Sequence, residues 1–279
     1  MTWRQAIERV RSRFARSSRA RMQTCARRIA KSTVFRGRLE ELEGRLVPTV
    51  SFDPTTHTLA VVGDKSRPRD DVIDVAITRR DFVAVRVNGQ MVRSIRHFGK
   101  VPAASVIAIS VRGLAGNDTL SVTGRFPQAD GKITLDGGAG NDSIIGSVVS
   151  DVLLGGDGTD TIRGGEGNDM LNGGADPDLV LGEGGNDTLM NDPRLPGNVV
   201  TTGDTLLGGD GDDTIRGGSD VDDLLYGEDG DDTLQSRESG PFYPGVDTLT
   251  GGSGSDFFQI SFWPVQITDL EEGDRTERI

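Results

Sequence analysis

Apolar and polar positions follow a fixed nine-residue cycle over residues 137–259. Position six of each unit is Asp, and the residue two places later is always apolar. Positions seven to nine predict a short strand in which the eighth side chain points inward and its neighbours point outward. Glycines at positions one, two and four predict a tight turn in backbone regions closed to other residues. The cycle therefore predicts a solenoid of short strands and turns.

Twelve units share this cycle. They run unbroken from Gly137 to Met190, resume at 199–216, continue through a ten-residue unit at 217–226, and end with 227–235, 242–250 and 251–259. Two insertions, Asn191–Asn198 and Ser236–Pro241, interrupt them. The inward column at position eight is Ile144, Leu153, Ile162, Leu171, Val180, Leu189, Leu206, Ile215, Leu224, Leu234, Leu249 and Phe258. In the ten-residue unit, Asp223 with Leu225 fits the pattern as well as Asp222 with Leu224.

The chemistry of the turns points to a hard cation. If two units make one coil, each turn stacks on the turn two units away, so carboxylates and main-chain carbonyls face each other between coils. Such an all-oxygen cage is what Ca²⁺ prefers. An EF-hand fits less well, because no helices flank these loops and no Glu closes a twelve-residue loop. The candidate calcium ligands are Gly140, Asp142, Gly158, Asp160, Gly167, Asp169, Asp178, Gly185, Asp187, Asp204, Gly211, Asp213, Asp222, Gly230, Asp232, Asp247, Gly254 and Asp256.

The pattern G-G-x-G-x-D-x-U-x, in which U is apolar, resembles the RTX (hemolysin-type) calcium-binding repeat. The resemblance covers residues 137–259 and, more weakly, Gly113–Leu120 (GLAGNDTL). It implies an all-β fold, a right-handed parallel β-roll, with calcium in the turns and export from the cell. A Gly/Asp-rich disordered linker or a metal-free solenoid is the alternative, but disorder would not fix an apolar residue two places after every Asp.

The two edges of the roll are predicted to differ. Units four, six, eight, ten and twelve keep Gly at positions one and four, whereas units five, seven, nine and eleven all depart from the pattern. Both insertions enter odd-numbered turns, and unit eleven opens with Phe242 and Tyr243, a candidate contact surface. We expect an even edge with an unbroken row of calcium sites, an odd edge with gaps, and fewer than ten strong sites in all.

Charge is segregated along the chain. Residues 1–45 carry 13 Lys and Arg against 4 Asp and Glu, whereas residues 137–259 carry 4 against 25. The acidic segment repels itself and needs cations to become compact. Folding is therefore expected to depend on Ca²⁺, which stabilises only the folded chain.

Residues 1–48 are predicted to be a basic leader. Trp3, Ile7, Val10 and Phe14 recur at helical spacing, so residues 2–30 could form a basic amphipathic helix. Leu39–Pro48 (LEELEGRLVP) resembles the LExLExRxxP-type tag of exported and surface proteins in one bacterial group, although Gly44 stands where an acidic residue is common. We interpret the segment as a targeting leader; membrane-surface or nucleic-acid contact is the alternative.

The other flanks are predicted to close the ends of the roll. In residues 49–136, the segments 72–77, 82–87 and 106–111 predict strands, and Asn88-Gly89 predicts a hairpin turn. We expect a β-rich region there that caps the roll. In residues 260–279, ITDLEEGD (267–274) resembles a segment that often follows RTX arrays, and the aromatic residues at 257–263 could cover the last coil. A secretion signal is the rival interpretation.

The sequence does not predict an enzyme. It has two histidines, His57 and His97, and neither an H-E-x-x-H zinc motif nor a G-x-S-x-G nucleophile elbow. A secreted or cell-surface calcium-binding protein with a structural or adhesive role fits best. The alternative is an exported enzyme or effector whose activity lies in residues 49–136 or in another chain. Calcium and an unidentified protein or surface are the expected partners; nucleic acid and a transmembrane segment are not expected.

Overall fold

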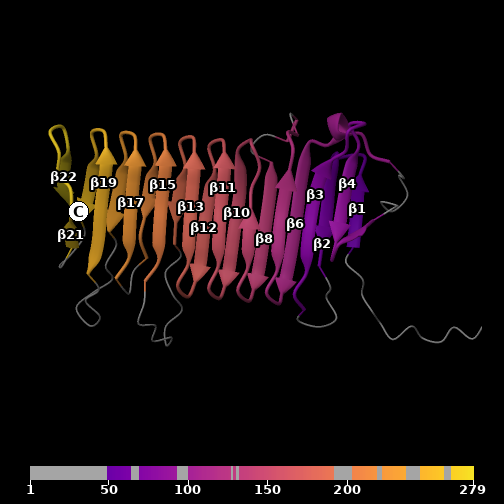
Figure 1. Ribbon diagram of the computed structural model, residues 1–279, viewed down its shortest axis with the longest axis horizontal. Helices are drawn as coiled ribbons and strands as arrows, with labels where there is room; N and C mark the ends of the chain where they lie inside the picture. Colours follow the sequence, from indigo (N-terminus) through magenta and orange to yellow (C-terminus); the bar gives the residue numbers. More distant parts are fainter. Residues whose placement is uncertain are drawn as a thin grey trace, which may run out of the picture. The chain divides into compact units, whose positions relative to one another are not determined.

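Two parallel β-sheets stack on each other and form a roll (Figure 1). The computed structural model describes residues 49–63, 69–92, 100–126, 128–129, 132–191, 203–218, 222–236, 246–260 and 265–279. The predicted leader helix and export tag lie outside these residues, as do His97, Phe242 and Tyr243. The chain divides into two units, Met1–Arg45 and Leu46–Ile279, and both sheets belong to the second.

The first sheet, called here sheet A, contains eleven strands. In spatial order they are β1 (Thr49–Asp53), β2 (Thr58–Val62), β6 (Ala108–Ala115), β8 (Ile133–Ala139), β10 (Asp151–Asp157), β12 (Met170–Ala175), β14 (Thr188–Met190), β16 (Thr214–Arg216), β18 (Thr233–Ser236), β20 (Phe257–Ile260) and β22 (Arg275–Arg278).

The second sheet, sheet B, also contains eleven strands. In spatial order they are β21 (Val265–Ile267), β19 (Asp247–Ser253), β17 (Leu224–Asp229), β15 (Thr205–Asp210), β13 (Leu179–Gly184), β11 (Thr161–Glu166), β9 (Ser143–Ile145), β7 (Thr119–Thr123), β3 (Val72–Ile77), β4 (Val83–Val87) and β5 (Gln90–Met91). A single 3₁₀ turn, η1 (Ala103–Ser105), lies between β5 and β6 in the described sequence.

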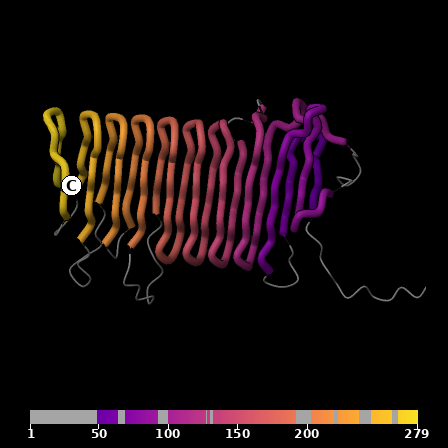
Figure 2. Tube along the Cα trace, viewed as in Figure 1, coloured from indigo at the N-terminus to yellow at the C-terminus, as the bar shows by residue number. Residues whose placement is uncertain are grey.

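Each coil contains two repeats, as the sequence predicts. Leu153 pairs with Leu171, and Leu171 pairs with Leu189, so position eight stacks on position eight at an interval of 18 residues. The chain passes from sheet A to sheet B through the odd-numbered turns and returns through the even-numbered turns, which stacks the coils along one axis (Figure 2). The all-β, two-sheet architecture is therefore confirmed.

The core lies between the two sheets and consists of a single layer formed by the inward side chains of both. Every position-eight side chain is buried, with at most 1% of its surface exposed, from Ile144 to Phe258. In the ten-residue unit Leu225 is fully buried, whereas Leu224 points outward and is 36% exposed. The assignment of Asp222 and Leu224 to the inward columns is therefore wrong, and the alternative, Asp223 with Leu225, is correct. The extra residue is absorbed in the turn because a one-residue slip would reverse every side chain in the strand.

The sheets continue on both sides of the twelve repeats. β2 and β6, and β3 and β7, pair in parallel and carry the same stack toward the N-terminal end. There the pairing becomes antiparallel, between β1 and β2, β3 and β4, and β4 and β5. Asn88 and Gly89 form the predicted hairpin turn with φ of 51° and 74°. At the other end β21 and β22 add one strand to each sheet.

Candidate metal centre

A ladder of buried aspartates runs along each edge of the roll. The main-chain N–H of Asp169 donates to Oδ1 of Asp187 at 2.8 Å, and the N–H of Asp187 donates to Oδ1 of Asp213 at 2.7 Å. Each position-six carboxylate therefore joins its own coil to the preceding coil. The even ladder is Asp151, Asp169, Asp187, Asp213, Asp232, Asp256 and Asp274. The odd ladder is Asp71, Asp118, Asp142, Asp160, Asp178, Asp204, Asp223 and Asp247.

A second, more exposed ladder runs in the opposite direction at position five. Oδ1 of Asn168 accepts the N–H of Asn186 at 3.2 Å, and Oδ1 of Asp212 accepts the N–H of Asp231 at 3.0 Å. Asp222 belongs to this ladder, since its Oδ1 accepts the N–H of Val246 at 2.6 Å. The side chains of positions five and six therefore clamp a coil to both of its neighbours, which fixes the spacing between turns.

The second oxygen of many ladder aspartates has no hydrogen-bond donor. Among the described residues, Oδ2 is buried and without a hydrogen bond in nine of them, which we call the open aspartates. They are Asp118, Asp142, Asp160 and Asp178 on the odd edge, and Asp169, Asp187, Asp213, Asp232 and Asp256 on the even edge. Because an unpaired buried carboxylate is costly, each of these oxygens calls for a compensating charge.

The glycines of the turn leave room beside these oxygens. A methyl group on Gly182, at position one, would overlap both Oδ2 of Asp187 and the carbonyl oxygen of Gly208 in the next coil. Gly227 has the same relation to Asp232 and Gly251. At position four, the predicted turn glycines Gly140, Gly158, Gly167, Gly185, Gly211, Gly230 and Gly254 have φ between 115° and 149°, in the region that favours glycine. The column of glycines thus brings carboxylate and carbonyl oxygens of adjacent coils together.

Burial governs the electrostatics of the ladders. It is the main cause that raises the pKa of Asp169 and of Asp178 to about 8; neighbouring carboxylates also raise this pKa, and amide hydrogen bonds lower it. Burial, opposed by an amide hydrogen bond, likewise raises the pKa of Asp160 and Asp213 to about 7 and that of Asp142 and Asp187 to about 6. Neutralising these carboxylates with a proton, or compensating their charge with a bound cation, therefore favours the folded roll.

Sequence patterns found most of these residues but not all of them. Asp71 and Asp274 extend the two ladders, although neither lies in a glycine-rich unit. Asp71 could have been found from the spacing alone, because buried Ile73 follows it by two residues. Asp274 offers no such signal, since Thr276 follows it at that distance and is exposed. His57 lies in the turn before β2, away from both ladders.

Comparison with protein-family models identifies the repeats. The model described as the RTX calcium-binding nonapeptide repeat matches four times, at residues 134–161, 154–189, 201–234 and 243–259. The chain carries RTX calcium-binding repeats. Comparison with curated proteins and with solved structures finds no significant match. The matched residues carry most of the two aspartate ladders, so the resemblance to RTX repeats is confirmed for this part of the chain.

The residues present fit a calcium ion in the manner that RTX repeats imply. Within the described ranges no group of three His, Cys, Asp or Glu side chains could hold a metal ion by itself. The available oxygens are instead one carboxylate per turn and the carbonyls of stacked glycines, which are hard donors. Asp142, Asp160, Asp169, Asp178, Asp187, Asp213, Asp232 and Asp256, predicted from sequence, all lie at such positions with an open Oδ2.

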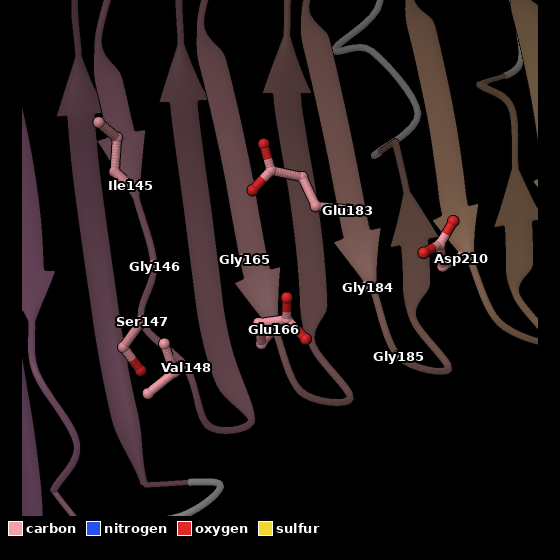
Figure 3. A pocket seen from close by; sticks show the side chains of 10 residues that line it. All are labelled: Ile145, Gly146, Ser147, Val148, Gly165, Glu166, Glu183, Gly184, Gly185 and Asp210. Atoms are coloured by element: carbon pink, nitrogen blue, oxygen red, sulfur yellow. The ribbon is translucent and has the colours of Figure 1, made fainter.

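A groove on the outside of the even edge differs from these buried positions. It encloses about 490 Å³ and is lined by Ser147, Val148, Glu166, Glu183 and Asp210, among others (Figure 3). The three carboxylates stand apart in the view, and that of Glu183 pairs with Arg163. Since the groove contains no buried open carboxylate, it is a feature of the surface and not part of the ladders.

Among the described residues, no helix is long and apolar enough to cross a membrane.

Proposed function

We propose that this chain is a secreted or cell-surface calcium-binding protein whose roll folds when Ca²⁺ binds between adjacent coils. The observation that supports this function is the set of nine buried Oδ2 atoms without a hydrogen-bond donor. Each lies beside a position-one glycine and, at several coils, beside the carbonyl oxygen of the stacked glycine. A divalent cation there would compensate the charge of residues 137–259, which carry 25 acidic and 4 basic side chains.

The proposed role is structural or adhesive and involves no chemistry of its own. The chain carries RTX repeats, which are typical of secreted bacterial proteins, and such a protein would meet a high calcium concentration only after export. The low calcium level of a cell interior would leave the acidic array unfolded, and the external medium would fold it. Affinity in the range of extracellular modules, on the order of 10⁻⁴–10⁻³ M, would suit that switch. No catalytic group is proposed, because the sequence offers no hydrolase or zinc-protease motif.

Far-UV circular dichroism of the full chain tests this function. In excess chelator the spectrum should be that of a coil, and millimolar CaCl₂ should convert it to β structure with a cooperative midpoint. MgCl₂ at the same concentration is the control, because Mg²⁺ dehydrates reluctantly and suits a flexible all-oxygen cage less well. If the spectrum in chelator already shows full β structure, or if calorimetry detects no heat from Ca²⁺, the proposed function is wrong.

A further inference from the structure

Between Asp118 and Asp256, four ladder aspartates differ from the nine open ones, because a donor of the protein already occupies their second oxygen; Asp274, at the C-terminal end of the even ladder, likewise accepts the N–H of Glu271 on Oδ2. We call Asp151, Asp204, Asp223 and Asp247 the closed aspartates. Oδ2 of Asp223 accepts the N–H of Gly218 at 2.7 Å, and Oδ2 of Asp247 accepts the Oγ–H of Ser236 at 2.6 Å. Oδ2 of Asp204 accepts from Nδ2 of Asn191. On the even edge, Oδ2 of Asp151 accepts the N–H of Ser147 at 2.5 Å.

The donors enter where the repeat is irregular. Asn191 and Ser236 are the first residues of the two insertions, and Gly218 belongs to the ten-residue unit. Asn191 also spans the gap between coils, since its Oδ1 accepts the N–H of Gly174 at 3.3 Å. Its amide group thus lies between a turn glycine and a ladder carboxylate. In the open coils, carboxylate and glycine carbonyl oxygens lie at the corresponding position.

Strand length separates the two classes independently of the hydrogen bonds. Before each of the nine open aspartates, the preceding strand continues through position three of the unit, as in β11, β13 and β15. The same holds for β6, which precedes Asp118. Before the closed aspartates it ends at or just after position nine, as in β9, β14, β16 and β18. When the strand ends early, the following N–H or side chain is released from the sheet and can turn toward the carboxylate. The closed turns are therefore a different local structure and not an accident of one rotamer.

We propose that hydrogen-bond donors of the chain replace calcium at the closed aspartates, so that the calcium row changes edges along the roll. This inference rests on the proposed function. The odd edge then binds calcium between Asp118 and Asp178, and the even edge binds it between Asp169 and Asp256. The open aspartates form three consecutive stacked pairs on the odd edge and four on the even edge. About seven ions are expected if each pair holds one.

This arrangement refines the prediction that the odd edge has gaps. The gaps lie in its C-terminal half, and they include Asp204 and Asp247, which the sequence pattern alone marks as ligands. An N–H or O–H donor offsets part of the buried charge without an ion, since a hydrogen bond to a charged group is stronger than one between neutral groups. That half of the edge can carry insertions because its turns no longer have to present carbonyl oxygens to a metal.

Equilibrium dialysis with radioactive calcium tests the inference on the full chain. Asp187→Asn, at an open position, should lower the number of bound ions by one or two. This carboxylate belongs to two stacked pairs, one with Asp169 and one with Asp213. Asp247→Asn, at a closed position, should leave the number unchanged. The substitutions are matched, because Asn keeps the oxygen that accepts the ladder N–H. If Asp247→Asn loses as many ions as Asp187→Asn, the inference is wrong; if the unsubstituted chain binds no calcium, the proposed function itself fails.

A second pair of variants keeps the test valid if an Asp→Asn variant does not fold. Ser236→Ala removes the donor to Asp247, so the calcium concentration at the folding midpoint should rise while the number of bound ions stays the same. Ser143→Ala, an outward position on β9, is the control and should not move the midpoint. An unchanged midpoint for Ser236→Ala would contradict the replacement of calcium by this hydroxyl group.

Discussion

The N–H of Asp187 donates to Oδ1 of Asp213 at 2.7 Å, although 26 residues separate them instead of the usual 18. The insertion that begins at Asn191 lies between them, and the ladder resumes in register behind it. An insertion in a turn therefore does not disturb the stack. The register of each coil against the next is fixed both by the buried apolar residues at position eight and by the carboxylate ladder.

Gly182→Ala should destabilise the roll by about 1–3 kcal/mol, the usual cost of overpacking. The new methyl group would overlap Oδ2 of Asp187 and the carbonyl of Gly208. Gly184→Ala is the matched control two residues away, since its methyl group would meet only Glu166 Oε2 at 3.4 Å. Thermal unfolding in saturating calcium measures both. Equal melting temperatures for the two variants would contradict the crowded geometry of position one.

Leu225→Ala should cost about 2–5 kcal/mol, and Leu224→Ala should change stability by less than about 0.5 kcal/mol. Leu225 is fully buried between the sheets, whereas Leu224 lies on the outer face of β17. Chemical denaturation of both variants in calcium gives the comparison. A larger effect at Leu224 would restore the register in which Asp222 occupies the buried ladder.

Glu228→Gly should stabilise the roll by about 1 kcal/mol. Glu228 stands at position two of its unit with φ of 79°, a left-handed conformation that costs an L-residue roughly 1–2 kcal/mol and glycine almost nothing. Asp229→Gly, at the next position, is the control and should not stabilise, because Asp229 has no positive φ and accepts a hydrogen bond from Ser253. A melting temperature that falls for Glu228→Gly would show that its side chain contributes more than the strain costs.

Acidification should favour the roll when calcium is absent. The pKa values of Asp169 and Asp178 are raised to about 8 in the folded chain, against an ordinary value of 3.8, chiefly by burial. The folded chain then binds more protons than the unfolded chain between these values, so the free energy of unfolding falls as pH rises toward 8. Circular dichroism in metal-free buffer should show more β structure at pH 5 than at pH 8. The opposite order would contradict the burial of these carboxyl groups.

Calcium should reverse that dependence on pH. Because the ion needs the carboxylate form, protons compete with it, and binding should release protons near neutral pH. The calcium concentration at the folding midpoint should therefore be higher at pH 6 than at pH 8. Calorimetry in two buffers of different ionisation enthalpy would measure the released protons, and a midpoint that does not depend on pH would exclude these aspartates as ligands.

The repeat, the residues at each of its positions and the oxygen ligands that it offers could all be predicted from the amino-acid sequence alone. The inward residues from Ile144 to Phe258 and the aspartates two places before them could be read directly, because a period of nine with alternating side chains allows only one buried face. The glycines predicted the turns for the same local reason. The sequence also predicted a difference between the two edges, from the place of the insertions.

Which aspartates are open depends on contacts between coils that no local pattern in the sequence predicts. Asp213 and Asp204 both stand at position six of their units. Oδ2 of Asp213 lacks a donor, whereas Oδ2 of Asp204 accepts from Asn191, the first residue of the preceding insertion. The choice between Asp222 and Asp223, and the membership of Asp71 and Asp274 in the ladders, likewise depend on which residues stack across coils. A local pattern fixes the conformation of one turn, whereas the environment of its carboxylate is set by a neighbouring coil about two repeats away.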